Sequence, residues 1–343
     1  MKIYDLRSDT VTLPSPAMRK AMHDAEVGDD VYADDPSVNR LQAMAAEITG
    51  TEAALFVSSG SMGNLIPVYL NCGRGNELLI DSRGHIVQHE LASCAAIAGA
   101  LPVTIPTKKG QLSVADLEGR IQPDIYYCQH TRMVELENTH NAAGGTYYPL
   151  ATLREIATFA RQRHLTVHLD GARLFNASIA SGVSVRDISA CADTVTFCLS
   201  KGLGCPVGAM LCGGTEFIAE ARRVRKMLGG GMRQVGIIAA AGIYALQHNV
   251  ERLAEDHENA RLIAQALAET SWASLDAKDV PTNIIYFETP GRGADDVVKA
   301  LEGVGIRSGA SGPSTIRFVT HLDISREDAK QVASIVRRLH LPA

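Results

Sequence analysis

Residues 165–173 read LTVHLDGAR, a run of apolar and β-branched residues that ends in Asp170, with Arg173 just beyond it. Similar short runs alternate with helical patterns from about residue 16 to residue 247. This alternation is typical of an α/β fold, in which helices cover a mostly parallel sheet. A carboxylate at the carboxyl end of such a strand points into the crevice where α/β proteins bind ligands. Alternatively, Asp170 caps the next helix.

Other runs of this kind predict the remaining strands of the large sheet. Leu150, Leu153, Ile156 and Ala160 fall at helical spacing between two of them and predict a crossover helix. Besides 165–170, the expected strands are Ala54–Ser58, Glu77–Asp81, Val103–Ile105, Ile125–Cys128, Met133–Glu137, Thr194–Leu199 and Ala209–Cys212.

The pattern changes after about residue 247. A long charged helix is expected over Val250 to Glu269, followed by a β-α-β-β-α pattern with strands near Asn283–Phe287 and Thr315–Val319. We therefore expect a large domain over residues 1–247, with an N-terminal arm of about residues 1–15, and a smaller α+β domain over residues 248–343.

The composition is that of an ordinary folded protein. The chain has 343 residues, of which 46% are hydrophobic and 21% charged, and a formal net charge of −5. Weak acidity argues against a nucleic-acid or anionic-membrane partner. Residues 1–9 contain Asp5, Arg7 and Asp9 and do not resemble a signal peptide. The longest apolar stretch, Gly236 to Leu246, is about half of the roughly 20 residues that span a bilayer and predicts a buried helix.

The seven cysteines form no CxxC pair. This suits reduced thiols in the cytoplasm better than a disulfide framework. Cys198, Cys205 and Cys212 are evenly spaced, but Gly and Pro interrupt the stretch and zinc sites normally use close pairs. We therefore expect no metal site.

Residues 58–64, SSGSMGN, follow an expected strand and precede an apolar helix. Such a turn directs free backbone N–H groups and a helix N-terminus at one point, which favours phosphate. Strand-to-helix turns often carry Gly and Ser for purely structural reasons, so this motif alone decides little.

Residues 196–202, TFCLSKG, are another apolar strand, and this one ends in Lys201. A lysine that is desolvated at a strand end, or set beside another cation, can have its pKa lowered enough to form a Schiff base. A surface lysine is the plain alternative. A phosphate cradle, an acid and such a lysine, in this order, are nevertheless the parts that pyridoxal phosphate requires.

The chain closely resembles the low-specificity L-threonine aldolases, which are fold-type-I pyridoxal-phosphate enzymes with an aspartate aminotransferase-like large domain. The resemblance runs almost from end to end. The motifs that carry it are DLRSDTVT at 5–12, GDDVY at 28–32, ENTHN at 137–141, DGAR at 170–173, SKG at 200–202, GGGMRQ at 229–234 and THLD at 320–323.

The resemblance implies a role for each residue of the cofactor site. Lys201 would hold pyridoxal phosphate covalently, His85 would stack on its ring, and Asp170 would pair with the ring nitrogen. The residues that would contact the phosphate are Gly60, Ser61 and Met62. Relatives often have Gln where Met62 stands, so one side-chain contact is not carried over.

The same resemblance assigns the substrate carboxylate to Ser8, Arg173 and Arg317, with Arg173 also near the cofactor. An arginine fork suits a carboxylate because it can bond to both oxygens. A surface or interface ion pair is the alternative for either arginine. The implied reaction is cleavage of L-threonine or L-allo-threonine to glycine and an aldehyde, with His85, or a water that it orients, taking the proton of the β-hydroxyl.

Other family positions bear on stereochemistry and assembly. Many relatives carry a second active-site histidine where this chain has Tyr127, so the preference between the two threonine isomers cannot be inherited. Tyr32 and Lys226 would contact the substrate, and Arg233 the cofactor, of a neighbouring subunit. The Gly229–Gly231 run suits a close backbone approach or a flexible loop. We expect a homodimer or homotetramer with its sites at the subunit interface.

Two rival functions remain open from sequence. The same scaffold also supports racemisation, transamination or β-elimination with the same cofactor. A cofactor-binding protein without catalytic activity is the other alternative. The presence of the residues that the resemblance assigns to the active site argues against it; these are Lys201, Asp170, Arg173 and His85.

Overall fold

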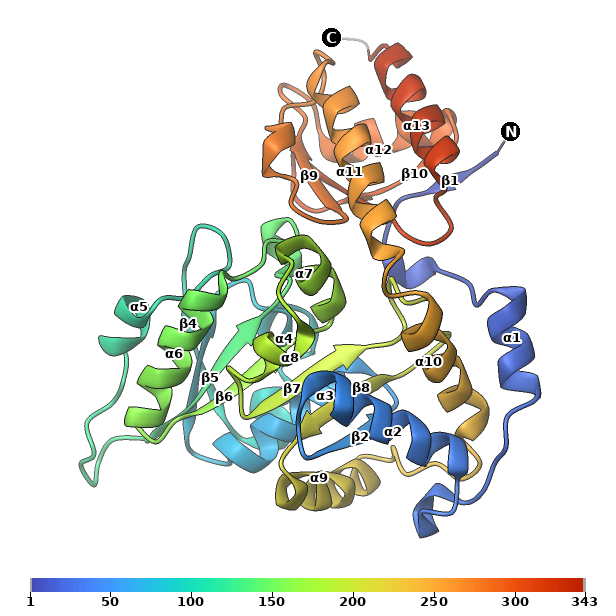
Figure 1. Cartoon of the computed structure of the whole chain (residues 1–343). Helices are drawn as coiled ribbons and strands as arrows, with labels where there is room; N and C mark the ends of the chain where they lie inside the picture. The colour runs from blue at the N-terminus through green and yellow to red at the C-terminus, as the bar shows by residue number, and fades with distance from the viewer. Residues whose placement is uncertain (1, 342–343) are drawn as a thin grey trace.

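A seven-stranded sheet lies at the centre of the computed structural model, which describes residues 2–341, and a smaller sheet lies beside it (Figure 1). The strand order is β2-β8-β7-β6-β5-β3-β4. Strands β3 to β7 are parallel, and β8 is antiparallel to both of its neighbours. The predicted α/β class with a mostly parallel sheet is therefore confirmed. The strands are β2 Ala53–Val57, β3 Glu77–Asp81, β4 Leu101–Ile105, β5 Thr131–Glu137, β6 Thr166–Asp170, β7 Thr194–Cys198 and β8 Ala209–Gly213.

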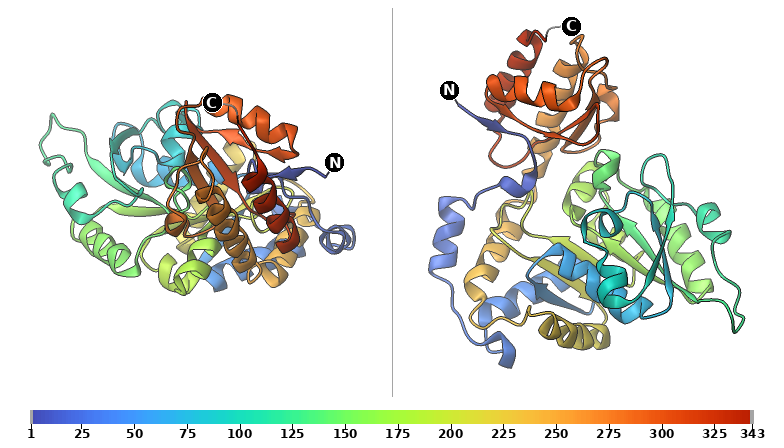
Figure 2. Two further views of the ribbon diagram at one scale, coloured as in Figure 1. Left: turned by 90° about the horizontal axis from the view of Figure 1, so that it is seen from above. Right: turned by 180° about the vertical axis from the view of Figure 1, so that it is seen from behind.

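Helices cover both faces of this sheet, as Figures 1 and 2 show. The predicted buried helix is α10, which packs against α1 and α2. The part of the chain that the structure describes contains no helix long and apolar enough to cross a membrane. The α-helices are α1 Pro16–His23, α2 Pro36–Thr49, α3 Gly60–Pro67, α4 His85–His89, α5 Val114–Glu118, α6 Leu150–Gln162, α7 Leu174–Ser181, α8 Val185–Ser189, α9 Thr215–Met227 and α10 Gly236–His248. Shorter helical segments are η1 Asp9–Val11, η2 Asp30–Tyr32, η3 Val68–Cys72, η4 Cys94–Ala98 and η5 Asn141–Ala143.

The two faces of the central strands differ in chemistry, because successive residues of a strand point to opposite faces. Val167 and Leu169 of β6 belong to the main apolar core, as do Val195 and Phe197 of β7. The alternate residues face α3 and are polar; they include Glu135, His168, Asp170, Thr194 and Thr196, all buried. The central strands β5 to β7 therefore carry buried polar side chains on the face toward α3, whereas β8 meets α3 with apolar residues.

The C-terminal elements have an apolar core of their own, to which the N-terminal residues Tyr4 and Leu6 also belong. Strand β1 is parallel to β10, with Tyr4 opposite Ile306, and Figure 2 shows the N-terminal strand beside the C-terminal elements. The antiparallel sheet has the order β11-β12-β9. The elements are β1 Tyr4–Asp5, α11 Leu253–Ala268, η6 Ala277–Asp279, β9 Ile284–Glu288, α12 Ala294–Gly303, β10 Ile306–Arg307, β11 Gly309–Ala310, β12 Thr315–Val319 and α13 Arg326–Arg338.

One predicted strand is wrong. Residues 125–128 form a turn in which Cys128 N–H donates to Ile125 O at 3.0 Å. The apolar composition of this run suggested burial, yet Tyr126 is 98% exposed and Tyr127 is 73% exposed. The run precedes β5, which begins at Thr131, and pairs with no neighbouring strand.

A buried ion pair joins the N-terminal segment to the large sheet. Arg173 follows β6 and donates from Nε and Nη2 to the two carboxylate oxygens of Asp9, each at 2.7 Å. The side chains are 4% and 0% exposed. Burial disfavours the charged form of Asp9, but the charge and hydrogen bonds of Arg173 outweigh it and hold the pKa of Asp9 well below the ordinary 3.8.

We predict that Gly63→Ala destabilises the protein by about 1–3 kcal/mol, because a Cβ at this position of α3 would overpack the interface with β7. That Cβ would lie 2.6 Å from Thr196 Cγ2. Thr196→Ser removes this methyl group, so the double variant should regain part of the loss in urea unfolding. A single variant as stable as the wild type would show that α3 has room to move away from the sheet.

We predict that Asp9→Asn costs about 3–5 kcal/mol of unfolding free energy, because it leaves Arg173 buried without a charged partner. Pairing with Arg173 lowers the pKa of Asp9 in the folded state. The contribution of the pair to the free energy of unfolding is therefore complete above pH 3.8 and is lost as the pH falls further. The difference in unfolding free energy between the wild type and Asp9→Asn, measured by urea unfolding, should thus be constant near neutral pH and become smaller in acid. Glu269→Gln, which breaks the exposed pair with Arg337, serves as the control and should change little.

Candidate active site

A cavity of about 310 Å³ lies at the carboxyl ends of the central strands. Asp170 ends β6, and Lys201 follows β7 by three residues. Both line the cavity together with His85 and the first residues of α3. Three stretches that are far apart in the sequence therefore meet around one space, as their strand-end positions predicted. The lining residues are Thr10, Ser58, Ser59, Gly60, Ser61, Asn64, His85, Glu90, Asp170, Ala172, Cys198, Ser200, Lys201, Pro206 and Val207.

The N-terminus of α3 opens on this cavity. Ser59 caps the helix and accepts a hydrogen bond from Met62 N at 3.2 Å. The N–H groups of Gly60 and Ser61 have no partner within the helix, as in the first turn of any helix, and such groups suit an anion. A Cβ on Gly60 would lie 2.7 Å from Cys198 Sγ, so glycine permits the close approach of α3 to β7.

The Met62 side chain packs against Ser58 and Gly230 and, unlike Gly60 and Ser61, is not among the residues that line the cavity. Its sulfur accepts a hydrogen bond from Ser58 Oγ at 3.6 Å, and Gly230 lies against it so closely that a Cβ there would be 2.6 Å from Sδ. Gly60 and Ser61 thus offer free backbone N–H groups at the cavity, whereas the N–H of Met62 is taken by Ser59, and phosphate binding by these residues stays a prediction.

Asp170 is buried at the end of β6 and is 1% exposed. Its Oδ1 accepts from Ala172 N at 2.9 Å and its Oδ2 from Asn64 Nδ2 at 2.8 Å. The carboxylate is thus fixed in direction, and it does not cap helix α7, which begins at Leu174.

His85 is the first residue of α4 and is held at two atoms. Its backbone N–H donates to Glu137 Oε2 at 2.9 Å, and its ring Nδ1 lies 2.8 Å from Glu90 Oε1. Burial opposes protonation, but the hydrogen bond to Glu90 and the charges of Asp170 and Glu90 outweigh it and raise the pKa of His85 above 6.5. Glu90 therefore holds the His85 ring at Nδ1.

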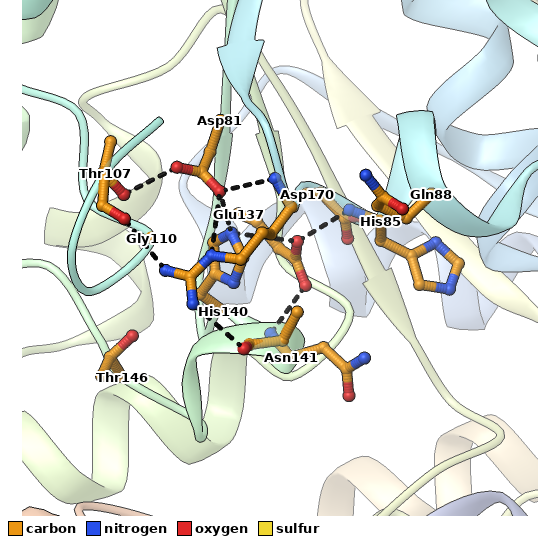
Figure 3. Close-up of polar contacts among 12 residues, drawn as sticks. Asp81, His85, Gln88, Thr107, Gly110, Glu137, His140, Asn141, Thr146 and Asp170 are labelled. Atoms are coloured by element: carbon orange, nitrogen blue, oxygen red, sulfur yellow. Dashed lines mark hydrogen bonds and ion pairs between the residues drawn. The ribbon is translucent and has the colours of Figure 1, made fainter. Parts of the chain in front are cut away.

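Glu137 organises the loop beyond β5 (Figure 3). Its Oε1 accepts from Asn141 N at 2.8 Å, while its Oε2 takes the N–H of His85. The buried His140 lies beside it, with Nε2 3.2 Å from Asp81 Oδ1 and 3.7 Å from Glu137 Oε2. The 137–141 motif thus connects His85 to Asn141.

Asn141 brings the two predicted carboxylate-binding arginines together. Its Oδ1 accepts from Arg173 Nη1 at 3.3 Å and from Arg317 Nη1 at 3.0 Å. Arg317 also donates to the carbonyl of Arg7 at 3.1 Å. Ser8 lies in the same segment and caps η1, accepting from Thr10 N at 3.2 Å.

The arginines differ in what they can offer a ligand. The fork of Arg173 is filled by Asp9, which leaves Nη1 directed at Asn141. Arg317, on β12, is held by two neutral oxygen atoms. Arg317 is therefore the better placed of the two to pair with an incoming carboxylate.

Four predicted site residues lie on the surface, away from this cavity. Tyr127 belongs to the turn before β5, at the opposite end of the sheet. Tyr32 is 73% exposed, and Lys226 is exposed at the end of α9. Arg233 pairs with Asp29 at 2.9 Å, its side chain 58% exposed. Within one chain these residues do not join the site, so their roles stay predictions.

Four residues that shape the site were not predicted from the sequence: Asn64, Glu90, Asn141 and Asp9. Asn64, Asn141 and Asp9 stand inside the quoted motifs, next to predicted site residues, and that position is a signal. Glu90 lies five residues after His85 and gives no signal by itself, since its role comes from a turn between them.

Comparison with known proteins matches this arrangement to one family. The beta-eliminating lyase family profile matches residues 5–290. The low-specificity L-threonine aldolase of Escherichia coli strain K12 is 44% identical over 333 residues, covering 97% of this chain and 98% of the relative. Low-specificity L-threonine aldolase 1 of Arabidopsis thaliana is 40% identical over 349 residues, covering 99% and 97%.

The solved structures agree in fold. A Leishmania major threonine aldolase superposes with a TM-score of 0.83 and 20% identity, covering 98% of this chain and 99% of the other. With near-complete coverage at 40–44% identity, this chain belongs to the low-specificity L-threonine aldolase family.

Proposed function

We propose that this protein uses pyridoxal phosphate to cleave L-threonine or L-allo-threonine, and other β-hydroxy-α-amino acids, into glycine and an aldehyde. The observation that carries the proposal is the meeting of Lys201, Asp170 and the α3 N-terminus around one cavity. Each alone has an ordinary structural explanation. Together, in a chain of this family, they match the parts of the cofactor.

The cavity residues fit pyridoxal phosphate in three chemically distinct places. The free N–H groups of Gly60 and Ser61 suit the phosphate, and Lys201 supplies the amine that its aldehyde needs. Asp170, already fixed by two donors, suits a protonated ring nitrogen. When bound, the cofactor withdraws electrons from the α-carbon of the amino acid, which makes the bond to the β-carbon breakable.

The chain's own contribution is to orient the amino acid. A carboxylate held by Arg317, with Arg173 and Ser8 beside it, fixes the rotation of the α-carbon. That rotation decides which bond stands perpendicular to the ring and therefore which bond breaks. The arginine pair joined by Asn141 is the anchor of this orientation.

His85 is the candidate for moving the proton of the β-hydroxyl. Glu90 and Asp170 raise the pKa of His85. The neutral imidazole, which can accept a proton, therefore predominates only at a pH higher than for an ordinary histidine. A rate that depends on this base should therefore rise as pH increases through and above 6.5.

Assembly and location extend the proposal. Tyr32, Lys226 and Arg233 have exposed side chains and would complete a neighbouring subunit's site in a homodimer or homotetramer. We place the enzyme in the cytoplasm, as its unpaired cysteines suggest; the seven cysteines are free thiols in the structure.

We predict that the purified protein with pyridoxal phosphate releases acetaldehyde from L-threonine and L-allo-threonine, and that Lys201→Ala abolishes this release because the attachment amine is gone. Lys20→Ala, at an exposed lysine, is the matched control and should keep full activity. A 2-oxo acid or D-threonine as the product would replace the proposal by a rival reaction. A bound cofactor without turnover of either isomer would refute the threonine substrate.

We predict that Arg317→Lys raises KM for threonine by about tenfold or more, because an ammonium group cannot hold both carboxylate oxygens in one fork. The rate constant kcat should fall too if the lost orientation is needed to break the bond. Steady-state kinetics on both isomers measure this, with Arg338→Lys on the exposed end of α13 as control. An unchanged kcat/KM would show that Arg317 does not bind the substrate carboxylate.

A further inference from the structure

A buried amide lies between the two acidic groups of the site. Asn64 is 2% exposed, and its Nδ2 donates to Asp170 Oδ2 at 2.8 Å and to Glu90 Oε1 at 3.0 Å. The same Glu90 oxygen lies 2.8 Å from Nδ1 of His85. Asp170 and His85 are thus connected through two intermediate side chains, Asn64 and Glu90.

The donors and acceptors of this bridge allow a single arrangement. Turning the Asn64 amide around would place its carbonyl oxygen against two carboxylates, so Nδ2 must face them. Its Oδ1 then faces His168 Nε2 at 3.2 Å and requires a proton there. Burial lowers the pKa of His168 to about 4, so its ring is neutral and its Nδ1 accepts, with Thr194 Oγ1 3.0 Å away.

The buried carboxylates around this bridge differ in the number of hydrogen bonds that they accept. Asp170, Glu90 and Glu137 each accept two hydrogen bonds from N–H groups. Glu135, 1% exposed, has an Oε1 without a hydrogen-bond partner in the described chain. Burial and the charges of Asp170, Glu137 and Glu90 raise the pKa of Glu135 well above its ordinary value.

We propose that Asn64 and Glu90 are positioning residues, in which Asn64 fixes the direction of the Asp170 carboxylate while Glu90 holds the ring of His85 and keeps its Nδ1 protonated. This inference rests on the proposed function, because it concerns the same cofactor site. Neither residue needs to touch the reacting atoms, since each acts through Asp170 or His85.

Four charged or titratable side chains near the His85 ring can influence its protonation. Glu90 follows it on the same segment, Asp170 ends β6, and Lys201 follows β7. His89 lies on α4 with its ring centre 5.4 Å from that of His85. Glu90 is the one of these that the structure places in hydrogen-bond contact with the His85 ring, so removing its charge should have the largest effect.

The first test is Glu90→Gln in the cofactor-loaded protein, with the titration of His85 followed by NMR of 13C-labelled histidine. The isosteric change removes a charge and keeps the volume, so we expect the acid dissociation constant of His85 to rise about tenfold or more. Glu77→Gln is the matched control: Glu77 is also fully buried, accepts from Thr131 and Gln129, and begins β3 at the far end of the sheet. It should leave His85 unchanged.

The second test is Asn64→Asp, which sets a third carboxylate between two others. We expect the affinity for pyridoxal phosphate, from absorbance titration, to fall about tenfold or more. Asn259→Asp places the same change in a buried asparagine of α11 that bonds to Ile324 and Arg326, and should leave cofactor affinity unchanged. If Asn64→Asp does not fold, Asn64→Ser, which removes the amide donor without adding a charge, takes its place and should lower the affinity in the same direction, while the Glu90→Gln titration decides the role of Glu90 independently.

The outcomes separate this inference from the proposed function. If Glu90→Gln destabilises the protein but leaves the His85 titration unchanged, Glu90 is merely structural and the inference is overturned. If wild-type protein binds the cofactor and cleaves neither threonine isomer while His85 shifts as expected, the function fails and the positioning roles stand.

Discussion

The ion pair between Asp9 and Arg173 holds together parts of the chain that the sequence keeps far apart. Asp9 comes from the N-terminal segment and Arg173 from the turn after β6, and both are fully enclosed. Asn283 Nδ2 approaches Asp9 at 3.4 Å from the start of β9, so the C-terminal elements join the same point. A bidentate pair of this kind has one favourable geometry, and it fixes where Arg317 stands relative to the central sheet.

The second constraint is the polar face of the central strands. A sheet covered by helices on both sides normally has apolar residues on both faces, yet here Glu135, His168, Asp170 and Thr196 face α3. Buried polar groups need partners, and Asn64 supplies three hydrogen bonds from one side chain. The close packing of α3, permitted by Gly60 and Gly63, makes those bonds reachable.

Much of this could be predicted from sequence, because strand runs with clear ends place their last side chains at one edge of the sheet. For this reason the sequence alone indicates Asp170, Lys201 and the glycine turn at 60–63 as candidate site residues. The strand predicted at residues 125–128 is a turn, because apolar composition does not show whether a neighbouring strand is available for pairing. Glu90 could not be predicted for a related reason, because a charged residue outside any motif is expected on the surface until tertiary contacts bury it.

The position of β1 has a consequence for how the chain is made. Tyr4 and Leu6 belong to the core of the C-terminal elements, and β1 pairs with β10 at residues 306–307. During synthesis on a ribosome, β1 must therefore wait until residues 306–307 have been made before its partner strand exists. Contacts of such long range are slow to form, so β1 is expected to join the structure late in folding and to stay unpaired until then.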